Sequence, residues 1–113
     1  MERLHLAADT GRRYAKVSGD YNPIHLYSWT ARLLGFRRPI AHGMYLVARA
    51  VAAIESRTVE PLDRLTVRFK TPAFLPGEPR LYLGRDGDAH AFELWGADGR
   101  PHVVGEGSSG AVR

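Results

Sequence analysis

Two side chains in the first quarter of the chain have the types and spacing of an acid–base pair. Asp20 and His25 stand five positions apart, and Asn22-Pro23 between them indicates a turn, because Pro23 disfavours the helical conformation for the residue before it. A chain reversal there would aim both side chains at one point. A carboxylate can orient a water molecule and accept its proton, and an imidazole can give or take another near neutral pH. Asn22 does not titrate but can hold either group, or the water, by hydrogen bonds.

A second group, His42-Gly43, immediately precedes the most apolar segment of the chain, which predicts a helix over residues 43–55. The first N–H groups of a helix lack intrahelical partners, and its dipole is positive at that end, so an oxyanion is favoured there. Glycine at position 43 would let a carbonyl group approach the backbone closely, and His42 is an expected contact for the oxyanion or substrate. An acid–base pair with an oxyanion donor is what addition of water to an α,β-unsaturated carbonyl requires.

Structural roles account for the same residues without chemistry. The sequence around Asp20 is rich in turn residues, and its side chain would cap the turn that follows. His42 would only pack or cap ahead of the helix. Three further histidines in strand-like contexts are interpreted as solvent-facing or packing residues without partners: His5, His90 and His102. No two histidines or carboxylates have metal-ligand spacing on one helix, which predicts that no metal is bound.

Periodicity predicts the elements that must position these residues. Helical patterns cover residues 10–17, 28–34 and 43–55, and the last is apolar nearly all round, which is typical of a helix buried on most sides. Alternating patterns predict strands at 62–69, 80–83, 90–95 and 102–105, with Leu65, Val67 and Phe69 on one face of the first. Several antiparallel strands after one buried helix predict an α+β fold in which a sheet wraps around that helix.

Length and composition indicate one globular domain over residues 1–113. The chain is 44% hydrophobic and 25% charged, which argues against disorder. It has no cysteine, which excludes disulfides, thiolate metal sites and a cysteine nucleophile. No run approaches the length of a membrane span, and the polar N-terminus lacks the apolar core of a signal peptide, so we expect a cytoplasmic protein. The Gly/Ser-rich end, residues 105–113, is expected to form a flexible tail.

The chain is basic, with 16 Lys+Arg against 12 Asp+Glu and a net charge of +4. The positive charges do not cluster into a run of five, which argues against nucleic acid as a partner. A small ligand that carries several phosphates would use the same charge equally well. The cations available for such phosphates are Arg64, Arg68, Lys70, Arg37 and Arg38.

The run from Tyr14 to His25 resembles the hydratase-2 motif of the MaoC-like, R-specific enoyl-CoA hydratase family. In that pattern an aromatic residue precedes Ser-Gly-Asp-x-Asn-Pro-Ile/Leu-His, and an alanine or serine follows, here Ala31. The resemblance continues through 35–36, 40–44 and 69–77, and so covers most of the chain. It implies a hot-dog fold, in which an antiparallel sheet wraps a long central helix. It also implies a role in fatty acid metabolism, namely the reversible hydration of trans-2-enoyl thioesters to (3R)-hydroxyacyl thioesters. No cofactor is expected.

Carried over by position, the resemblance implies a role for each motif residue. Asp20 and His25 would be the catalytic pair, Asn22 would support them, and the Gly43 N–H would polarise the thioester carbonyl. The substrate would be an acyl-CoA or acyl-ACP thioester. An exposed edge strand and the family resemblance together predict a homodimer with sheets joined edge to edge. The beginning of the chain also resembles the second half of longer, two-hot-dog members, so a detached half is the alternative to an autonomous homodimer.

Two other functions are compatible with this fold. A hot-dog thioesterase would also use an acidic residue and a helix N-terminus, but its motifs do not normally contain Asp20, Asn22 and His25 in this arrangement. A non-catalytic module that binds acyl thioesters or serves as a structural half would normally have lost one of these residues, and all three are present.

Overall fold

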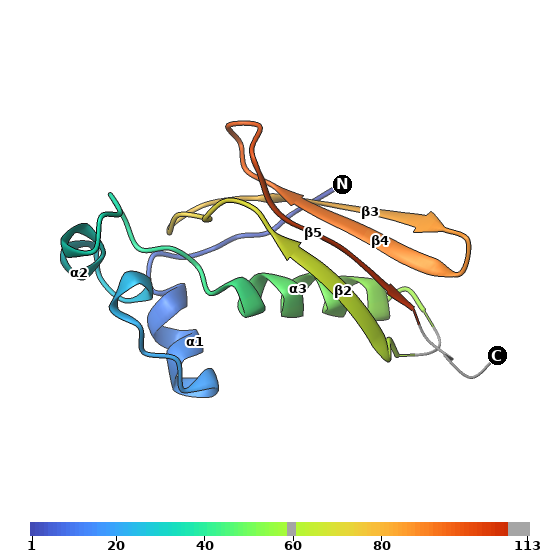
Figure 1. Cartoon of the computed structure of the whole chain (residues 1–113), viewed down its shortest axis with the longest axis horizontal. Helices are drawn as coiled ribbons and strands as arrows, with labels where there is room; N and C mark the ends of the chain where they lie inside the picture. The colour runs from blue at the N-terminus through green and yellow to red at the C-terminus, as the bar shows by residue number, and fades with distance from the viewer. Residues whose placement is uncertain (59–60, 109–113) are drawn as a thin grey trace.

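The structure is a computed structural model that describes residues 1–58 and 61–108 (Figure 1). The helices lie in the first half of the chain and most of the strands in the second, as predicted. In chain order the elements are β1 (Glu2–Arg3), α1 (Thr10–Ser18), the 3₁₀ helix η1 (Pro23–His25), α2 (Ser28–Leu33), α3 (Gly43–Glu55), β2 (Arg64–Phe69), β3 (Arg80–Asp86), β4 (Ala89–Trp95) and β5 (Pro101–Ser108).

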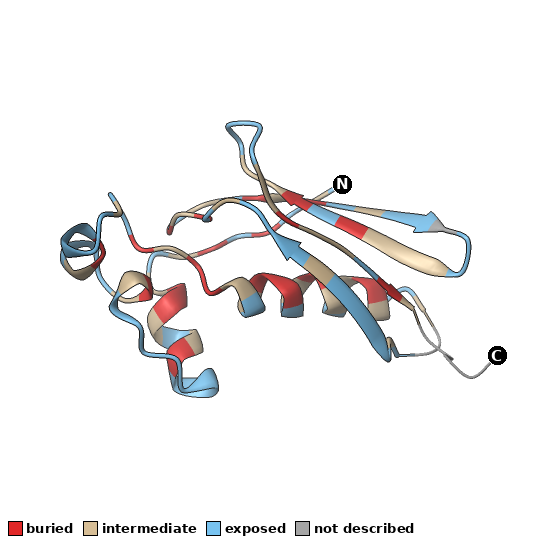
Figure 2. Cartoon of the chain, in the orientation of Figure 1, coloured by how far each residue is buried: buried red, intermediate tan, exposed pale blue. Residues whose placement is uncertain are grey.

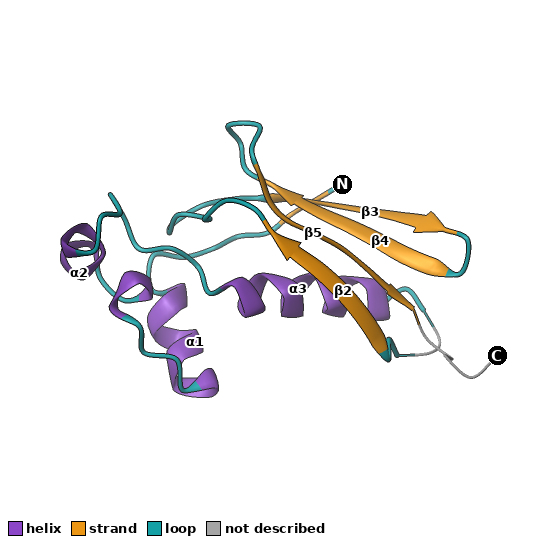
Figure 3. Ribbon diagram, in the orientation of Figure 1, coloured by secondary structure: helices purple, strands orange, loops and turns teal. Residues whose placement is uncertain are grey.

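The strands form one antiparallel sheet in the order β1-β3-β4-β5-β2 (Figure 3). Strand β5 lies between β4 and β2, and its pairing with β2 runs from Val103–Phe69 to Ser108–Arg64. The expectation of a flexible tail from residue 105 is therefore wrong for residues 105–108, because both edges of β5 are hydrogen-bonded to a neighbouring strand. The rest of the expected tail, residues 109–113, lies outside the described residues.

Helix α3 packs lengthwise against β4 and β5 and provides the centre of the core (Figure 2). Its buried residues are Leu46, Val47, Ala50 and Ile54. The opposite side, with Met44, Ala48 and Ala52, is exposed, so the expectation of burial on most sides is wrong for the single chain. The reason is that the sheet covers one side of the helix only. Within the described ranges, no helix is long and apolar enough to cross a membrane.

Strand β2 forms one edge of the sheet. Leu65, Val67 and Phe69 alternate along it as predicted, yet Leu65 is 42% exposed and Phe69 is 53% exposed. Val67 between them is partly buried against the core. Leu65 and Phe69 remain accessible because α3 makes its main sheet contacts with β4 and β5 rather than with the edge strand. An apolar strand face and an apolar helix face are thus left uncovered.

Candidate active site

The turn after α1 fixes the position of Asp20. Gly19 ends α1 in the left-handed conformation, with φ +80°, which glycine adopts without a steric penalty. The Asp20 N–H donates to Ser18 Oγ (3.1 Å), and Asp20 Oδ1 accepts from the Asn22 N–H (3.1 Å). Asn22 Oδ1 in turn accepts from the Ile24 N–H (3.2 Å). The turn-forming role considered for these residues is therefore real, and it leaves Asp20 Oδ2 free for another interaction.

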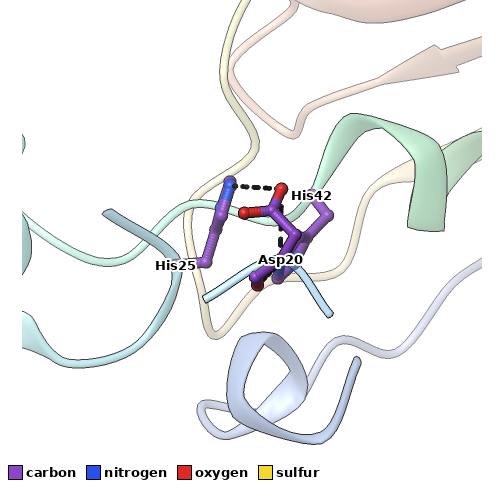
Figure 4. A group of neighbouring side chains, drawn as sticks. All are labelled: Asp20, His25 and His42. Carbon is purple, nitrogen blue, oxygen red and sulfur yellow. Dashed lines mark hydrogen bonds and ion pairs between the residues drawn. The ribbon is translucent and has the colours of Figure 1, made fainter. Parts of the chain in front are cut away.

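The loop that precedes α3 holds the His25 ring through its Nδ1 atom. Its Nδ1–H donates to the Ile40 carbonyl oxygen (2.7 Å), and the Ile40 N–H donates to the Ile24 carbonyl oxygen (3.0 Å). Because a carbonyl oxygen can only accept, Nδ1 carries the proton and Nε2 is left with a lone pair. That Nε2 lies 3.9 Å from Asp20 Oδ2, which is too long for a direct hydrogen bond (Figure 4).

The environment of His25 favours its neutral form. Burial lowers its pKa, and coulombic repulsion from His42 acts in the same direction. The bond to Ile40 and the charge of Asp20 oppose this shift but do not reverse it. A neutral imidazole with a free Nε2 beside a carboxylate is a proton acceptor that can become a donor during a reaction.

His42 joins this pair from a position 22 residues beyond Asp20. Its side chain is buried, and its Nε2–H donates to the main-chain carbonyl oxygen of Asp20 (2.9 Å). Its ring stacks on that of His25, with centroids 3.8 Å apart and planes 23° from parallel. The Tyr14 ring meets His42 edge-on at 4.9 Å. Figure 4 shows Asp20 reaching both imidazoles.

Asp20 and His42 open onto a cavity of about 640 Å³ at the N-terminus of α3. Its apolar walls include Met44, Leu46, Phe69, Ala73 and Val103. Gly43 and Met44 line this cavity, and among the described residues none accepts a hydrogen bond from the N–H of either. Two backbone donors and the positive end of the helix dipole are therefore available at this end of α3. A Cβ at Gly43 would lie 2.6 Å from the Phe69 ring, so a larger residue at this position would require that ring to move.

A glycine inside α1 was not singled out from the sequence. A Cβ at Gly11 would overlap the carbonyl oxygen of His25, so α1 and η1 pack backbone to backbone at this point. The available signal was a glycine within an otherwise helical pattern, which costs stability relative to alanine and therefore indicates a packing or functional reason.

The five cations considered for phosphate binding do not form one cluster. Lys70 lines the cavity, while Arg37 and Arg38 line an adjoining hollow of about 610 Å³ that shares part of its wall with it. Arg64 and Arg68 lie on the edge strand β2, and Arg64 borders a separate small hollow.

His102 has a different environment from the one expected. It is partly buried between the cavity and the adjoining hollow, with Nδ1 3.1 Å from the Thr71 carbonyl oxygen. Burial lowers the pKa of His102. His5 also has a partner, Glu78, at 3.7 Å. The interpretation of these two histidines as lacking partners is wrong, because the pairing residues are distant in sequence.

Asp20, His25 and His42 offer ligand atoms within 4.8 Å of one another, a spacing that a metal ion could use. The three residues come from different segments, so no ligand spacing was visible on one helix. His42 Nε2 is already engaged as a donor to Asp20, however, and would have to give up that bond to bind a metal. Among the described residues, Asp20 Oδ2, His25 Nε2 and His42 Nδ1 have no hydrogen-bond partner. The absence of a metal stays a prediction.

An antiparallel sheet over one long helix, with an Asp–His pair at the helix N-terminus, defines a hot-dog domain. Residues 2–95 match the family model described as "MaoC like domain". The chain belongs to the MaoC-like domain family.

Individual relatives agree with this assignment. The chain is 42% identical over 94 residues to 3-hydroxyacyl-thioester dehydratase X of Mycobacterium tuberculosis, a match that covers 82% of this chain and 33% of that protein. The crystal structure of HtdX from the same organism superposes with a TM-score of 0.86 at 37% identity, over 95% of this chain and 46% of that one. The R-hydratase PhaJ1 from Pseudomonas aeruginosa gives a TM-score of 0.75 at 30% identity, over 94% of this chain and 74% of that one. The chain thus spans about a third of the length of the curated relative.

Proposed function

We propose that the chain is a hydratase that adds water reversibly to trans-2-enoyl thioesters and yields (3R)-hydroxyacyl thioesters. The observation that carries this proposal is the Asp20–His25 pair, with Oδ2 and Nε2 3.9 Å apart and Asp20 on the wall of an apolar cavity. The N-terminus of α3 faces the same cavity. The names of the relatives, a 3-hydroxyacyl-thioester dehydratase and an R-hydratase, support the same reaction class.

In the proposed mechanism, one water molecule lies between Asp20 Oδ2 and His25 Nε2 and donates a hydrogen bond to each. Its oxygen attacks C3 of the enoyl thioester while the pair accepts one proton. The pair then returns one proton to C2, so water is added without loss or gain of atoms. Because both groups lie on the same side of the substrate, addition is syn. Asn22 supports the pair by holding the turn that carries Asp20.

The charge that develops on the thioester oxygen is stabilised at the start of α3. The Gly43 N–H is the proposed main donor, and the Met44 N–H and the helix dipole add to it. The acyl chain lies along the apolar walls of the cavity. If the carrier is CoA, its phosphates meet Lys70 together with Arg37 and Arg38 in the adjoining hollow. Arg64 and Arg68 are less suited to this role because the edge strand that carries them leads away from the cavity.

Incubation with crotonyl-CoA tests the proposed reaction directly. Hydration removes the absorbance of the conjugated enoyl thioester and leaves the thioester intact. Thioesterase action would instead release a free thiol, and a non-catalytic binding module would do neither. Chiral analysis of the product then distinguishes the expected 3R alcohol from the 3S alcohol, and a 3S product would contradict the assignment of the pair.

We also propose that the chain acts as a homodimer. The uncovered faces of β2 and of α3 are both apolar, and the small side chains of Ala48 and Ala52 would allow a second helix to approach closely. Pairing of two β2 edges would satisfy the free backbone groups and cover Leu65 and Phe69. Light scattering at micromolar concentration should give twice the mass of the chain, and a monomeric mass would contradict this.

The cytoplasmic location stays a prediction.

A further inference from the structure

We propose that His42 is a positioning residue, which holds Asp20 in place beside His25 through the hydrogen bond from its Nε2–H to the Asp20 carbonyl oxygen. The inference rests on the proposed hydration activity, since it concerns how the same acid–base pair is held. It assigns His42 a role different from a contact to the oxyanion or the substrate.

The local hydrogen bonds of Asp20 hold it within its own turn, residues 18–24, but none of them reaches the start of α3. Asp20 lies on the turn between α1 and η1, and its side chain is 54% exposed. Within the described part of the chain, His42 is the only donor to its carbonyl oxygen. His42 is a suitable anchor because its ring is fixed on two sides, by the stacked His25 ring and by the edge of Tyr14. The fixed ring therefore sets the position of the more exposed turn.

Packing alone does not account for a histidine at position 42. Its Nδ1 is buried and, among the described residues, has no hydrogen-bond partner. A buried polar atom without a partner costs stability. Phenylalanine could fill the same stacked position without this cost, but it would lose the donor to Asp20. The bond to Asp20 is the feature of the site that requires a nitrogen.

Two substitutions separate the donor from the ring. His42→Gln removes the aromatic ring but retains an N–H group that can reach the Asp20 carbonyl oxygen, whereas His42→Phe retains a stacked ring and removes the donor. We expect His42→Phe to lower kcat for crotonyl-CoA hydration by about 100-fold, because a displacement of about 1 Å at a reacting group has an effect of that size. The loss of kcat in His42→Gln should be at least about tenfold smaller than the loss in His42→Phe. Because His42 lines the cavity, KM is measured in both variants: a change common to the two reports the altered wall, and the effect of the donor is the difference between their kcat values.

The pH profile provides a readout that a purely structural residue would not alter. The groups that face the His25 ring are the Asp20 carboxylate and the His42 imidazole. The Tyr14 ring lies against His42, and the Tyr45 ring, whose hydroxyl accepts from Arg49, lies against Tyr14. Both substitutions remove the imidazole that repels a charge on His25. The acid limb of the kcat/KM profile should therefore shift to higher pH in both variants, while kcat falls strongly only in His42→Phe.

Several outcomes would overturn the inference. Equal losses in the two folded variants would show that the ring, not the donor, matters, and a wild-type rate in His42→Phe would show that neither does. If His42→Phe does not fold, ¹⁵N chemical shifts of the wild-type histidines decide the matter, because a bare Nε2 on His42 excludes the bond to Asp20. Asp20→Asn distinguishes the two proposals. Retained activity in that variant contradicts the proposed function, whereas its loss together with a wild-type rate in His42→Phe contradicts the inference on His42 alone.

Discussion

Removal of the acid–base groups one at a time, and then together, tests whether they act on one water molecule. Asp20→Asn retains the size of the side chain and an oxygen for the Asn22 N–H, and His25→Asn can still donate from its amide to the Ile40 carbonyl oxygen. Because no direct bond joins the two side chains at 3.9 Å, neither substitution leaves the other group without its own anchor. We therefore expect both variants to fold.

The expected kinetic effect is large and not additive. A positioned acid–base group contributes about 10²–10⁴-fold, so each single substitution should lower kcat for crotonyl-CoA hydration by at least about 100-fold. Asp20→Asn should change the free energy of unfolding by no more than about 0.5 kcal/mol, since the side chain is half-exposed. The double variant should be little slower than the slower single one, because groups that act as a unit are lost together.

The controls change the same residue types away from the cavity. Asp88→Asn, in the turn between β3 and β4, and His90→Gln, on β4, should retain wild-type kinetics. Circular dichroism and thermal unfolding confirm that each variant is folded. A folded Asp20→Asn variant with near-wild-type hydration would refute the role of the carboxylate. A double variant that shows the product of the two single losses would refute the shared water.

Three further predictions follow from particular contacts. Gly11→Ala should lower both Tm and hydration activity, because its Cβ would displace the His25 carbonyl; an unchanged Tm in a thermal scan would contradict the packing. Burial places the pKa of His25 below its ordinary value of 6.5, so the unfolded chain binds more protons. The free energy of unfolding should therefore be greatest above about pH 6.5 and fall at lower pH, and urea titrations should show a weaker dependence in His25→Asn. Arg37→Ala with Arg38→Ala should raise KM for a CoA substrate with little change in kcat, whereas Arg64→Ala, the matched control, should not.

The order and type of the elements could be predicted because the local patterns agree with the tertiary structure. The helix at 43–55 and the alternating strands appear where periodicity places them. The errors concern what covers each face. Periodicity identifies Met44, Ala48 and Leu65 as apolar, but it does not state which neighbouring element reaches them. The end of β5 was missed for a related reason, because its glycines and serine are ordered by pairing with β2 and β4 rather than by their own propensity.

The proximity of Asp20 and His25 could be predicted because both lie on one turn, where a short sequence determines the geometry. His42 and Gly43 could be placed at the start of a helix, but the contacts between distant segments that complete the site could not be predicted. His42 reaches Asp20 across 22 positions, His102 meets Thr71 across 31, and Gly11 packs on the backbone of His25. None of these residues has a local pattern that reveals its partner.

Residues outside the motif hold its turn in place. In the proposed mechanism Asp20 and His25 supply the reacting groups and Asn22 supports them. The turn that carries them is held by hydrogen bonds to two residues ahead of α3, Ile40 and His42. The same stretch, 40–43, also places the Gly43 N–H beside the cavity. A shift of this stretch would therefore move the acid–base pair and the oxyanion donor together. The inference on His42 therefore predicts that an intact Asp-x-Asn-Pro-x-His motif is not sufficient for hydration. A chain that keeps the motif but lacks a donor at the position of His42 should bind the thioester and turn it over slowly.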